Sequence, residues 1–477
     1  MIAMCSVIGL YSKRGADVSG EAHTLISSLS HRGPRAFGVK TPQAEKKSET
    51  LGGLLPLPKS PVVLGHCLLS TTGFGIQPLS SGAVSVAHNG QIYNYRELDP
   101  NPREKPVSDS EVIARFLRKA LDGGGDFDGA ARRFFSEAEG EFAVGALHGG
   151  KLYAFRDLLG IKPLWFGEND SLRAFASEPR ALMKIGIPSP EPLLPGHLLE
   201  ISGKGLSVGQ VYSLADFRET VPEKHSPASL KTAFESVMDS RCAGLKKAAV
   251  LFSGGVDSSL IAKAVSERVP ETVLFVAGVE GSHDLEAAES SAESLGLALE
   301  KITLSKEAVR SLASRSMEIL SVFDGMQVGL SVPELACAGR IKEKGFTVVF
   351  SGQGSDELFC GYSSYVNSLK ERGFPGVEEE IWAALERMHS RNFYRDDIIL
   401  ASQSLELRVP FMSLPFVKAA MSIPAAEKIK SAEDSLRKHP IRELARSCGI
   451  QDSIASRPKK AMQYGSGVQK IVSKIVR

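Results

Sequence analysis

The heptapeptide SGGVDSS, at residues 253–259, constrains this chain more than any other sequence feature. It directly follows the apolar run KKAAVLF, which predicts a buried strand, and it directly precedes SSLIAKAV, whose apolar spacing predicts a helix. Open α/β sheets bind their ligands at such junctions between a strand and a helix. We therefore expect a doubly wound parallel sheet around this segment.

The residue types in this loop suit a pyrophosphate group. Gly254 and Gly255 carry no β-carbon, so their backbone N–H groups can approach an anion, and the helix that follows adds its positive end. Ser253 and Ser258 add hydroxyl donors. Asp257 would repel a phosphate, so we assign it to Mg²⁺, which would bridge to the phosphates. ATP cleaved between its α and β phosphates is the predicted chemistry, since the chain has no GxxxxGKS or GxxxxGKT loop.

A second strand ends in a similar way. The apolar run FTVVF leads into SGQGSDELFCGY, at residues 351–362, which again places small residues before acidic ones. Asp356 is positioned to complete the metal or pyrophosphate site from a neighbouring strand. An alternative is that Ser355 and Asp356 simply start a helix, and both interpretations can hold together.

The pattern of strand-like and helical segments changes along the chain and predicts two domains, and the length of 477 residues predicts the same. Residues 1–215 contain short strand-like runs broken by Gly, Pro and Ser, with helical patterning only before His31 and after Asp109, so we expect an α+β sandwich of stacked antiparallel sheets. Residues 216–227 are charged, contain proline and are aperiodic, which is typical of a linker. Residues 228–477 alternate apolar strands with helices and then become helical from about Tyr365.

Composition excludes several classes of function. The chain has 57 basic and 55 acidic side chains, so it has no basic field for nucleic acid or an anionic membrane. Its six cysteines lack the spacing of a zinc site or a disulfide framework, and a reducing cytoplasm is the simplest location. The start of the chain does not resemble a signal peptide, and no apolar run is long enough to span a membrane. We expect small-molecule substrates as partners and leave a homodimer open.

Four segments of the second domain carry a specific resemblance. The segments are SGGVDSS, GVEGSHDLEAA, SGQGSDELFCGY and ELRVPF. The first is similar to the PP-loop of ATP pyrophosphatases, and together they resemble the synthetase domain of glutamine-dependent asparagine synthetases. This resemblance implies that Phe252, Ala277, Ser351 and Gly352 border the nucleotide. It also implies a lysine that stabilises charge during adenylation, and in RPKKAMQYGSG either Lys459 or Lys460 matches it.

The first domain resembles class II glutamine amidotransferases. The segments HRGPRAFG, GHCLLSTTG, HNGQIYNYREL, SDSEV and RDLLGIKPLW occur in the order found in that family. The resemblance implies that Cys5 attacks the glutamine amide, that the Asn89 side chain and the Gly90 N–H stabilise the oxyanion, and that these two residues, with Gln91 and Asp109, bind glutamine. Without the flanking motifs, Asn89 and Gly90 would be interpreted as a hairpin turn.

The nucleophile requires a particular N-terminus. If translation starts at Met4 and this initiator methionine is removed, or if residues 1–4 are trimmed, Cys5 gains a free α-amine beside its thiol, and the two form a compact base and nucleophile. With three residues before Met4 that amine does not exist, and we favour a start at Met4. Mass spectrometry of the native N-terminus tests this hypothesis.

Two positions depart from the family patterns. Leu68 stands where the amidotransferases carry an arginine for the glutamine α-carboxylate, and leucine cannot pair with a carboxylate. Arg32 or Arg35 would have to reach the same anion from another segment. Gln353 stands where bacterial asparagine synthetases carry a glutamate, and an amide cannot transfer a proton or carry charge.

The resemblance implies an ATP- and Mg²⁺-dependent asparagine synthetase that takes ammonia from glutamine. An alternative, motivated by Leu68 and Gln353, is an amide ligase for another carboxylate that uses free ammonia. A third interpretation is a non-catalytic nucleotide-binding protein. Retention of Cys5, Asn89 and the two aspartates counts against it, because a scaffold needs neither a nucleophile nor metal carboxylates.

Overall fold

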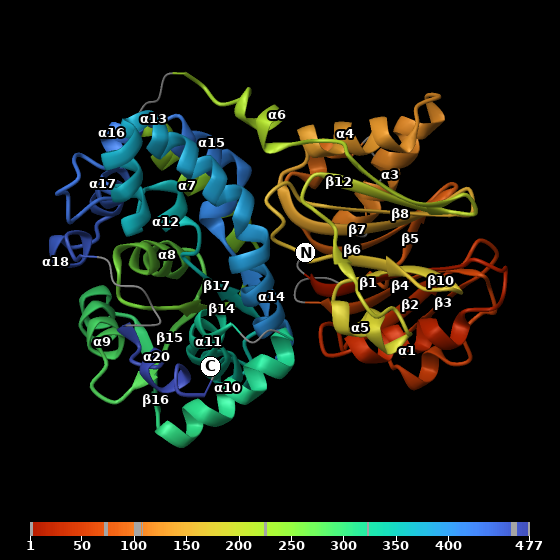
Figure 1. The fold of residues 1–477 in the computed structure, drawn as a ribbon, viewed down its shortest axis with the longest axis horizontal. Coiled ribbons are helices and arrows are strands. Elements are labelled where there is room, and N and C mark those ends of the chain that lie inside the picture. The colour runs from red at the N-terminus through yellow and green to blue at the C-terminus, as the bar shows by residue number, and fades with distance from the viewer. Residues whose placement is uncertain are drawn as a thin grey trace. The chain divides into compact units, whose positions relative to one another are not determined.

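The computed structural model describes residues 3–70, 75–99, 106, 108–223, 227–321, 324–458 and 465–475. Contacts divide the chain into two compact units, residues 1–217 and residues 218–477 (Figure 1). Each unit has its own sheet, which confirms the predicted two-domain organisation.

The N-terminal unit is built on antiparallel strands. Neighbouring strands follow the order β11-β9-β10-β1-β6-β7-β8-β12-β13, while β4 joins β1 to β2, β2 pairs with β3, and β5 pairs with β6. The strands are β1 (Ala3–Ser12), β2 (Ala36–Lys40), β3 (Glu45–Ser48), β4 (Val62–Ser70), β5 (Leu79–Ser81), β6 (Val84–Ile92), β7 (Gly140–His148), β8 (Lys151–Arg156), β9 (Trp165–Glu168), β10 (Leu172–Ala176), β11 (Glu191–Pro192), β12 (His197–Ser202) and β13 (Gly205–Gln210).

Three apolar clusters show that these strands form two stacked layers between helices. One cluster lies between the helices α3 (Asp109–Asp122) and α4 (Phe127–Glu137) and the strands β6, β7 and β8. A second lies between α1 (Ser19–Leu29), α5 (Pro179–Lys184) and the layer that contains β1 and β4. The third fills the space between the two strand layers. Figure 1 shows α3 and α4 on one side of this unit and α1 and α5 on the other. The predicted sandwich of antiparallel sheets is therefore confirmed.

The helix α4 was not expected from the sequence. Its buried residues recur at helical spacing and are Phe127, Ala130, Ala131, Phe134 and Phe135. Asp126 caps its first turn by accepting a hydrogen bond from the Gly129 N–H at 2.8 Å. The three glycines at 123–125 and the glycine inside the helix obscure this pattern in the sequence. The remaining short helices of this unit are α2 (Tyr95–Leu98), α6 (Leu214–Arg218), which continues into the second unit, and a 3₁₀ turn, η1 (Gly52–Leu54).

The C-terminal unit contains a parallel sheet with the order β16-β15-β14-β17-β18. Its strands are β14 (Lys247–Leu251), β15 (Glu271–Val279), β16 (Ala298–Leu304), β17 (Val348–Phe350) and β18 (Glu406–Arg408). The chain moves outward from β14 to β16 and then returns to the other side of β14. With right-handed crossovers, this reversal places helices on both faces of the sheet, so the predicted doubly wound fold is confirmed.

Helices make up the rest of this unit. They are α7 (Pro227–Cys242), α8 (Val256–Ser266), α9 (His283–Leu295), α10 (Lys306–Leu320), α11 (Gly325–Glu343), α12 (Ser355–Leu358), α13 (Ser363–Met388), η2 (His389–Phe393), α14 (Tyr394–Ala401), η3 (Pro410–Met412), α15 (Leu414–Met421), α16 (Ala425–Lys428), α17 (His439–Ser447), α18 (Asp452–Ala455) and α20 (Gln469–Val472). The region after Tyr365 is helical as predicted, except for β18. That strand has three residues, too few for a periodic pattern to show in the sequence.

No helix in the described ranges is long and apolar enough to cross a membrane. All six cysteines lie in these ranges, and none forms a disulfide.

Candidate functional site

The SGGVDSS loop lies between the end of β14 and the start of α8, as the sequence predicts. Gly255 is the residue before the helix, so the first N–H groups of α8 point into the loop. The Ser258 hydroxyl donates to the Gly255 carbonyl at 3.2 Å and lies 3.3 Å from the Ser253 hydroxyl. Backbone donors and hydroxyl groups therefore gather at one helix end, which is the arrangement that an anion requires.

Gly254 has a backbone that other residues rarely adopt. Its φ angle is +71°, and a β-carbon there would lie 2.7 Å from the Ala288 nitrogen and collide with the Ala287 carbonyl. Its own carbonyl accepts hydrogen bonds from the Ser291 hydroxyl at 2.9 Å and from Arg457 at 2.8 Å. The loop is thus held against α9 by its glycine backbone.

The second predicted loop contacts the first. A β-carbon on Gly352 would meet the Asp257 β-carbon at 3.2 Å, so the two loops pass each other closely. The Ser355 hydroxyl donates to Asp257 Oδ1 at 2.6 Å. β14 and β17 are neighbours at the point where the strand order reverses, and this proximity follows from the position of their carboxyl ends.

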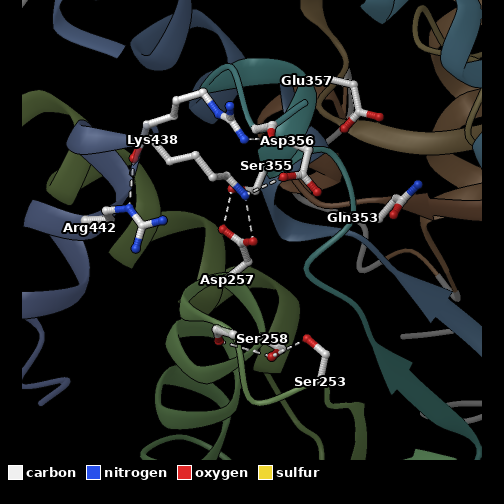
Figure 2. A network of polar contacts seen from close by, with 12 residues as sticks. Ser253, Asp257, Ser258, Gln353, Ser355, Asp356, Glu357, Lys438 and Arg442 are labelled. Atoms are coloured by element: carbon white, nitrogen blue, oxygen red, sulfur yellow. Dashed lines mark hydrogen bonds and ion pairs between the residues drawn. The ribbon is translucent and has the colours of Figure 1, made fainter. Parts of the chain in front are cut away.

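Asp257 and Asp356 converge on one cation, the Lys438 ammonium group. Lys438 Nζ lies 2.7 Å from Asp257 Oδ2 and 2.8 Å from Asp356 Oδ1, and Lys438 is only 1% exposed (Figure 2). The sequence patterns did not predict a role for this residue, which lies 181 positions after Asp257. No motif or spacing marks it, because only the packing of α17 against α8 brings the two segments together.

The backbone around Lys438 is held in an unusual conformation. Arg437 and Lys438 have φ angles of 44° and 58°, in the left-handed region. Asp434 Oδ1 accepts the N–H groups of Leu436 and Arg437 at 3.1 and 3.0 Å. Arg442 donates to the carbonyls of Arg437 and Leu436, both at 2.8 Å. Such strain persists where surrounding contacts determine the conformation, and it is common at functional sites.

A pocket opens at this junction. It is lined by Ser253, Gly255, Val256, Asp257, His283, Asp284, Ala287, Lys438, Arg442, Arg457 and Pro458. Arg442 donates to the Arg457 carbonyl at 3.0 Å and so joins the Lys438 segment to the C-terminal segment of the pocket wall. Three of the predicted ATP-binding residues line the pocket, namely Ser253, Gly255 and Asp257.

The carboxylates fit a magnesium ion in donor type and placement. Asp257 and Asp356 both reach one cation, and carboxylate oxygens are the ligands that Mg²⁺ prefers. The described residues contain no group of three or more acidic, histidine or cysteine side chains that could hold a metal. Two carboxylates are sufficient for a magnesium ion that takes its other ligands from phosphates and water.

Other residues that the sequence predicts for the synthetase site are not among those that line the pocket. Phe252 and Ala277 are buried at the ends of β14 and β15, and the Phe252 N–H donates to the Phe275 carbonyl. The Gln353 N–H donates to the Ser351 hydroxyl at 3.3 Å, and Figure 2 shows the Gln353 side chain apart from the Lys438 contacts. The predicted Lys459 and its alternative Lys460 lie outside the described residues.

In the N-terminal unit, the predicted nucleophile lies where the two strand layers meet. β1 pairs with β4 along its length and touches β6 at the single pair Ala3 and Gly90. Cys5 is fully buried, and its N–H donates to Asn89 Oδ1 at 3.0 Å. Asn89 Nδ2 is also buried and has no hydrogen-bond partner in the described part of the chain. A donor of this kind suits an oxyanion.

The other predicted glutamine residues are adjacent. Gly90 has a φ angle of +132°, and a β-carbon there would collide with the Glu141 carbonyl. Gln91 is buried, and its Oε1 has no partner among the described residues. Asp109 accepts the N–H groups of Ile92 and Ser110 at 3.0 and 2.9 Å. Burial nevertheless raises the pKa of its carboxyl group to about 6.

The side chain opposite Cys5 is apolar. Cys5 and Leu68 are direct partners across β1 and β4, and both pack with Ala36 and Ile76. Arg32 is not available to replace the family arginine that Leu68 has displaced, because it donates to the Cys5 carbonyl at 3.2 Å and to Glu178 at 3.1 Å. Burial raises the pKa of Glu178, but the hydrogen bond from His31 and the charge of Arg32 outweigh this effect and lower it to about 2. The Arg35 residue is exposed.

Each of the two units contains a match to a known protein family. Residues 229–376 and 370–477 match the asparagine synthase family, and residues 68–184 match the glutamine amidotransferase domain. An amidotransferase unit followed by such a synthetase unit defines an enzyme of the carbon–nitrogen ligase type. The chain belongs to the asparagine synthase family.

Individual relatives are similar over most of this chain. A Methanocaldococcus jannaschii protein, provisionally named asparagine synthetase (glutamine-hydrolyzing) 1, is 29% identical over 99% of this chain and 96% of its own length. Asparagine synthetase (glutamine-hydrolyzing) 2 of Oryza sativa is 28% identical over 88% of this chain and 69% of its own. Among solved structures, a glutamine phosphoribosylpyrophosphate amidotransferase from B. subtilis is 18% identical with a TM-score of 0.39, covering 62% of this chain and 65% of its own.

Proposed function

We propose that this enzyme adenylates aspartate with ATP and aminates the product with ammonia from glutamine, giving asparagine, AMP and diphosphate. The convergence of Asp257 and Asp356 on a buried cation beside the loop at the start of α8 carries the proposal. A site of this kind can hold the β and γ phosphates while the α-phosphorus accepts an oxygen nucleophile.

The reaction balances as two displacements. A carboxylate oxygen of aspartate attacks the α-phosphorus, and diphosphate leaves. Ammonia then attacks the activated acyl carbon, and AMP leaves with the former carboxylate oxygen. In this proposal, Lys438 and the N–H groups at the start of α8 would stabilise negative charge on the departing diphosphate. Asp257 and Asp356 would hold Mg²⁺, which supplies charge neutralisation when bound.

The N-terminal unit would supply the ammonia. With a free α-amine at Cys5, the thiolate attacks the glutamine amide carbon, ammonia leaves, and water hydrolyses the resulting thioester. Asn89 Nδ2 is a buried donor beside Cys5, which supports its role in stabilising the oxyanion. Asp109 would pair with the α-ammonium group of glutamine.

A second candidate function follows from Leu68. Because Leu68 packs directly against Cys5, and Arg32 is engaged by Glu178, the glutamine α-carboxylate lacks an evident partner among the described residues near Cys5. An enzyme that uses free ammonia, on aspartate or on another carboxylate, is consistent with this site. Gln353 supports a changed acceptor, since it replaces an ionisable group beside the phosphate loop.

Paired assays separate these candidates. AMP and diphosphate are measured with aspartate and with a panel of other carboxylic acids, each with glutamine or with ammonium chloride as the nitrogen donor. Aspartate-stimulated diphosphate release with either donor supports the synthetase assignment. If aspartate does not stimulate release but another acid does, the acceptor assignment is wrong. Activity restricted to ammonium would identify the second candidate.

The cellular setting is part of the proposal. We propose a cytoplasmic enzyme that acts on small molecules, consistent with its balanced charge and its cysteines without disulfides. A homodimer remains a hypothesis, which light scattering of the purified protein tests.

A further inference from the structure

The Lys438 ammonium occupies the place where a metal ion between Asp257 and Asp356 would lie. Its nitrogen is 2.7 and 2.8 Å from one oxygen of each carboxylate. The other oxygen of Asp257 accepts the Ser355 hydroxyl at 2.6 Å, so the orientation of this carboxylate is fixed. A divalent cation that bridged the two facing oxygens would need the same space, and it would repel the ammonium group.

We propose that Lys438 and a divalent cation compete for Asp257 and Asp356, so that the metal enters this site only together with a phosphate anion that takes over the lysine. The inference rests on the proposed adenylation site. It assigns Lys438 two positions, between the two carboxylates in the free enzyme and on the phosphate anion once the metal and the anion are bound.

Burial explains why an anion is needed. Lys438 is 1% exposed, and a buried ammonium group without a counterion is strongly unfavourable. A metal alone would take both carboxylates and leave this charge unpaired. Phosphate oxygens in the pocket lined by Ser253, Gly255 and Lys438 would accept the ammonium while also binding the metal.

The backbone permits this exchange without a loop movement. Asp434 and Arg442 hold the chain on both sides of the left-handed Arg437 and Lys438 through N–H and carbonyl groups. The Lys438 side chain, in contrast, donates to the two carboxylates that would bind the metal. Rotation about the four-carbon side chain is sufficient to move the ammonium from carboxylate to phosphate.

The consequence is a reciprocal coupling between metal binding and diphosphate binding: each should strengthen the other.

Two measurements on the full-length protein test this coupling. The protein is titrated with Mn²⁺ without nucleotide, and free Mn²⁺ is measured by electron paramagnetic resonance. Binding of inorganic pyrophosphate is measured by calorimetry with and without Mn²⁺. We expect the wild type to bind Mn²⁺ weakly by itself. Lys438→Met should bind Mn²⁺ at least about tenfold more tightly, because a competing charge has been removed. Lys430→Met, an exposed lysine of the same segment, should behave as the wild type.

Equal Mn²⁺ affinities for folded Lys438→Met and the wild type would overturn the inference. Thermal melts establish whether Lys438→Met folds, since two neighbouring carboxylates would lose the ammonium group between them. The wild type provides an independent test: the inference is also wrong if Mn²⁺ does not strengthen pyrophosphate binding. None of these measurements uses aspartate or glutamine. If neither the wild type nor the variants bind Mn²⁺, even with pyrophosphate, the proposed metal site is wrong as well. If Lys438→Met merely fails to bind Mn²⁺ more tightly than the wild type, the proposed function is unaffected.

Discussion

Cys5 and Leu68 face each other directly across β1 and β4, so an apolar side chain lies against the predicted nucleophile. The relationship matters because glutamine carries an α-carboxylate that needs a positive partner. Under the proposed function, it bears on how the Cys5 site would bind glutamine and not on the attack of the thiolate on the amide.

Leu68→Arg should lower the KM for glutamine. A hydrogen bond to a charged group contributes about 1.5–3 kcal/mol, so we expect a decrease of about tenfold or more with little change in kcat. Steady-state glutaminase assays measure this effect, and Leu68→Met, which keeps the site apolar, is the control. An unchanged or higher KM in a folded Leu68→Arg protein would show that the carboxylate is bound elsewhere.

Asn89→Ala should impair glutamine hydrolysis selectively. Loss of one oxyanion donor lowers kcat by about 10²-fold or more. The ammonia-dependent reaction of the same variant is the internal control and should keep its rate, because Asn89 lies beside Cys5 in the N-terminal unit and the proposed adenylation site lies in the C-terminal unit. Equal losses with both nitrogen donors would contradict the assignment of Asn89 to the oxyanion.

Gly254→Ala should destabilise the protein more than Gly255→Ala. The first substitution combines a positive φ angle with a collision against α9, and we expect a loss of more than about 2 kcal/mol in the free energy of unfolding. A β-carbon on Gly255 meets only the Ser253 hydroxyl, at 3.5 Å, so this neighbour is a matched control. Denaturant unfolding measures both variants, and equal midpoints would argue against the close approach of the loop to α9.

The glutamine reaction should lose efficiency as the pH falls through about 6. Burial raises the pKa of Asp109 to about 6, so protonation below this pH removes the negative charge that would attract the glutamine α-ammonium. Burial lowers the pKa values of His66 and His88 to about 3, so these neighbours stay neutral over the same range. The kcat/KM for glutamine is measured from pH 5 to 8.

Asp109→Asn supplies the control for this profile. The variant should have a low kcat/KM without the inflection near pH 6, because the titrating group is gone. An inflection that persists in Asp109→Asn would assign the titration to another group, such as the Cys5 α-amine or thiol.

Much of the fold was predictable because its signals are local. The apolar runs that became β14, β15, β16 and β17 are each followed by recognisable turn or helix residues, so neither their type nor their order needed tertiary information. The strand β18 and the helix α4 escaped prediction for different reasons. β18 has three residues and is defined by its pairing with β17, while α4 has a regular apolar pattern interrupted by glycine.

The amino-acid sequence by itself determined the strand–loop–helix arrangement around SGGVDSS and the order of the two domains, and it predicted Cys5, Asn89, Asp257 and Asp356 as reactive groups. These features depend on residue type and short spacing, which the sequence contains directly. Only the tertiary structure decided that Lys438 lies between the two aspartates, that Arg32 is engaged by Glu178, and that Leu68 covers Cys5. Each of these relationships joins segments far apart in the chain, and their distances depend on how strands and helices pack.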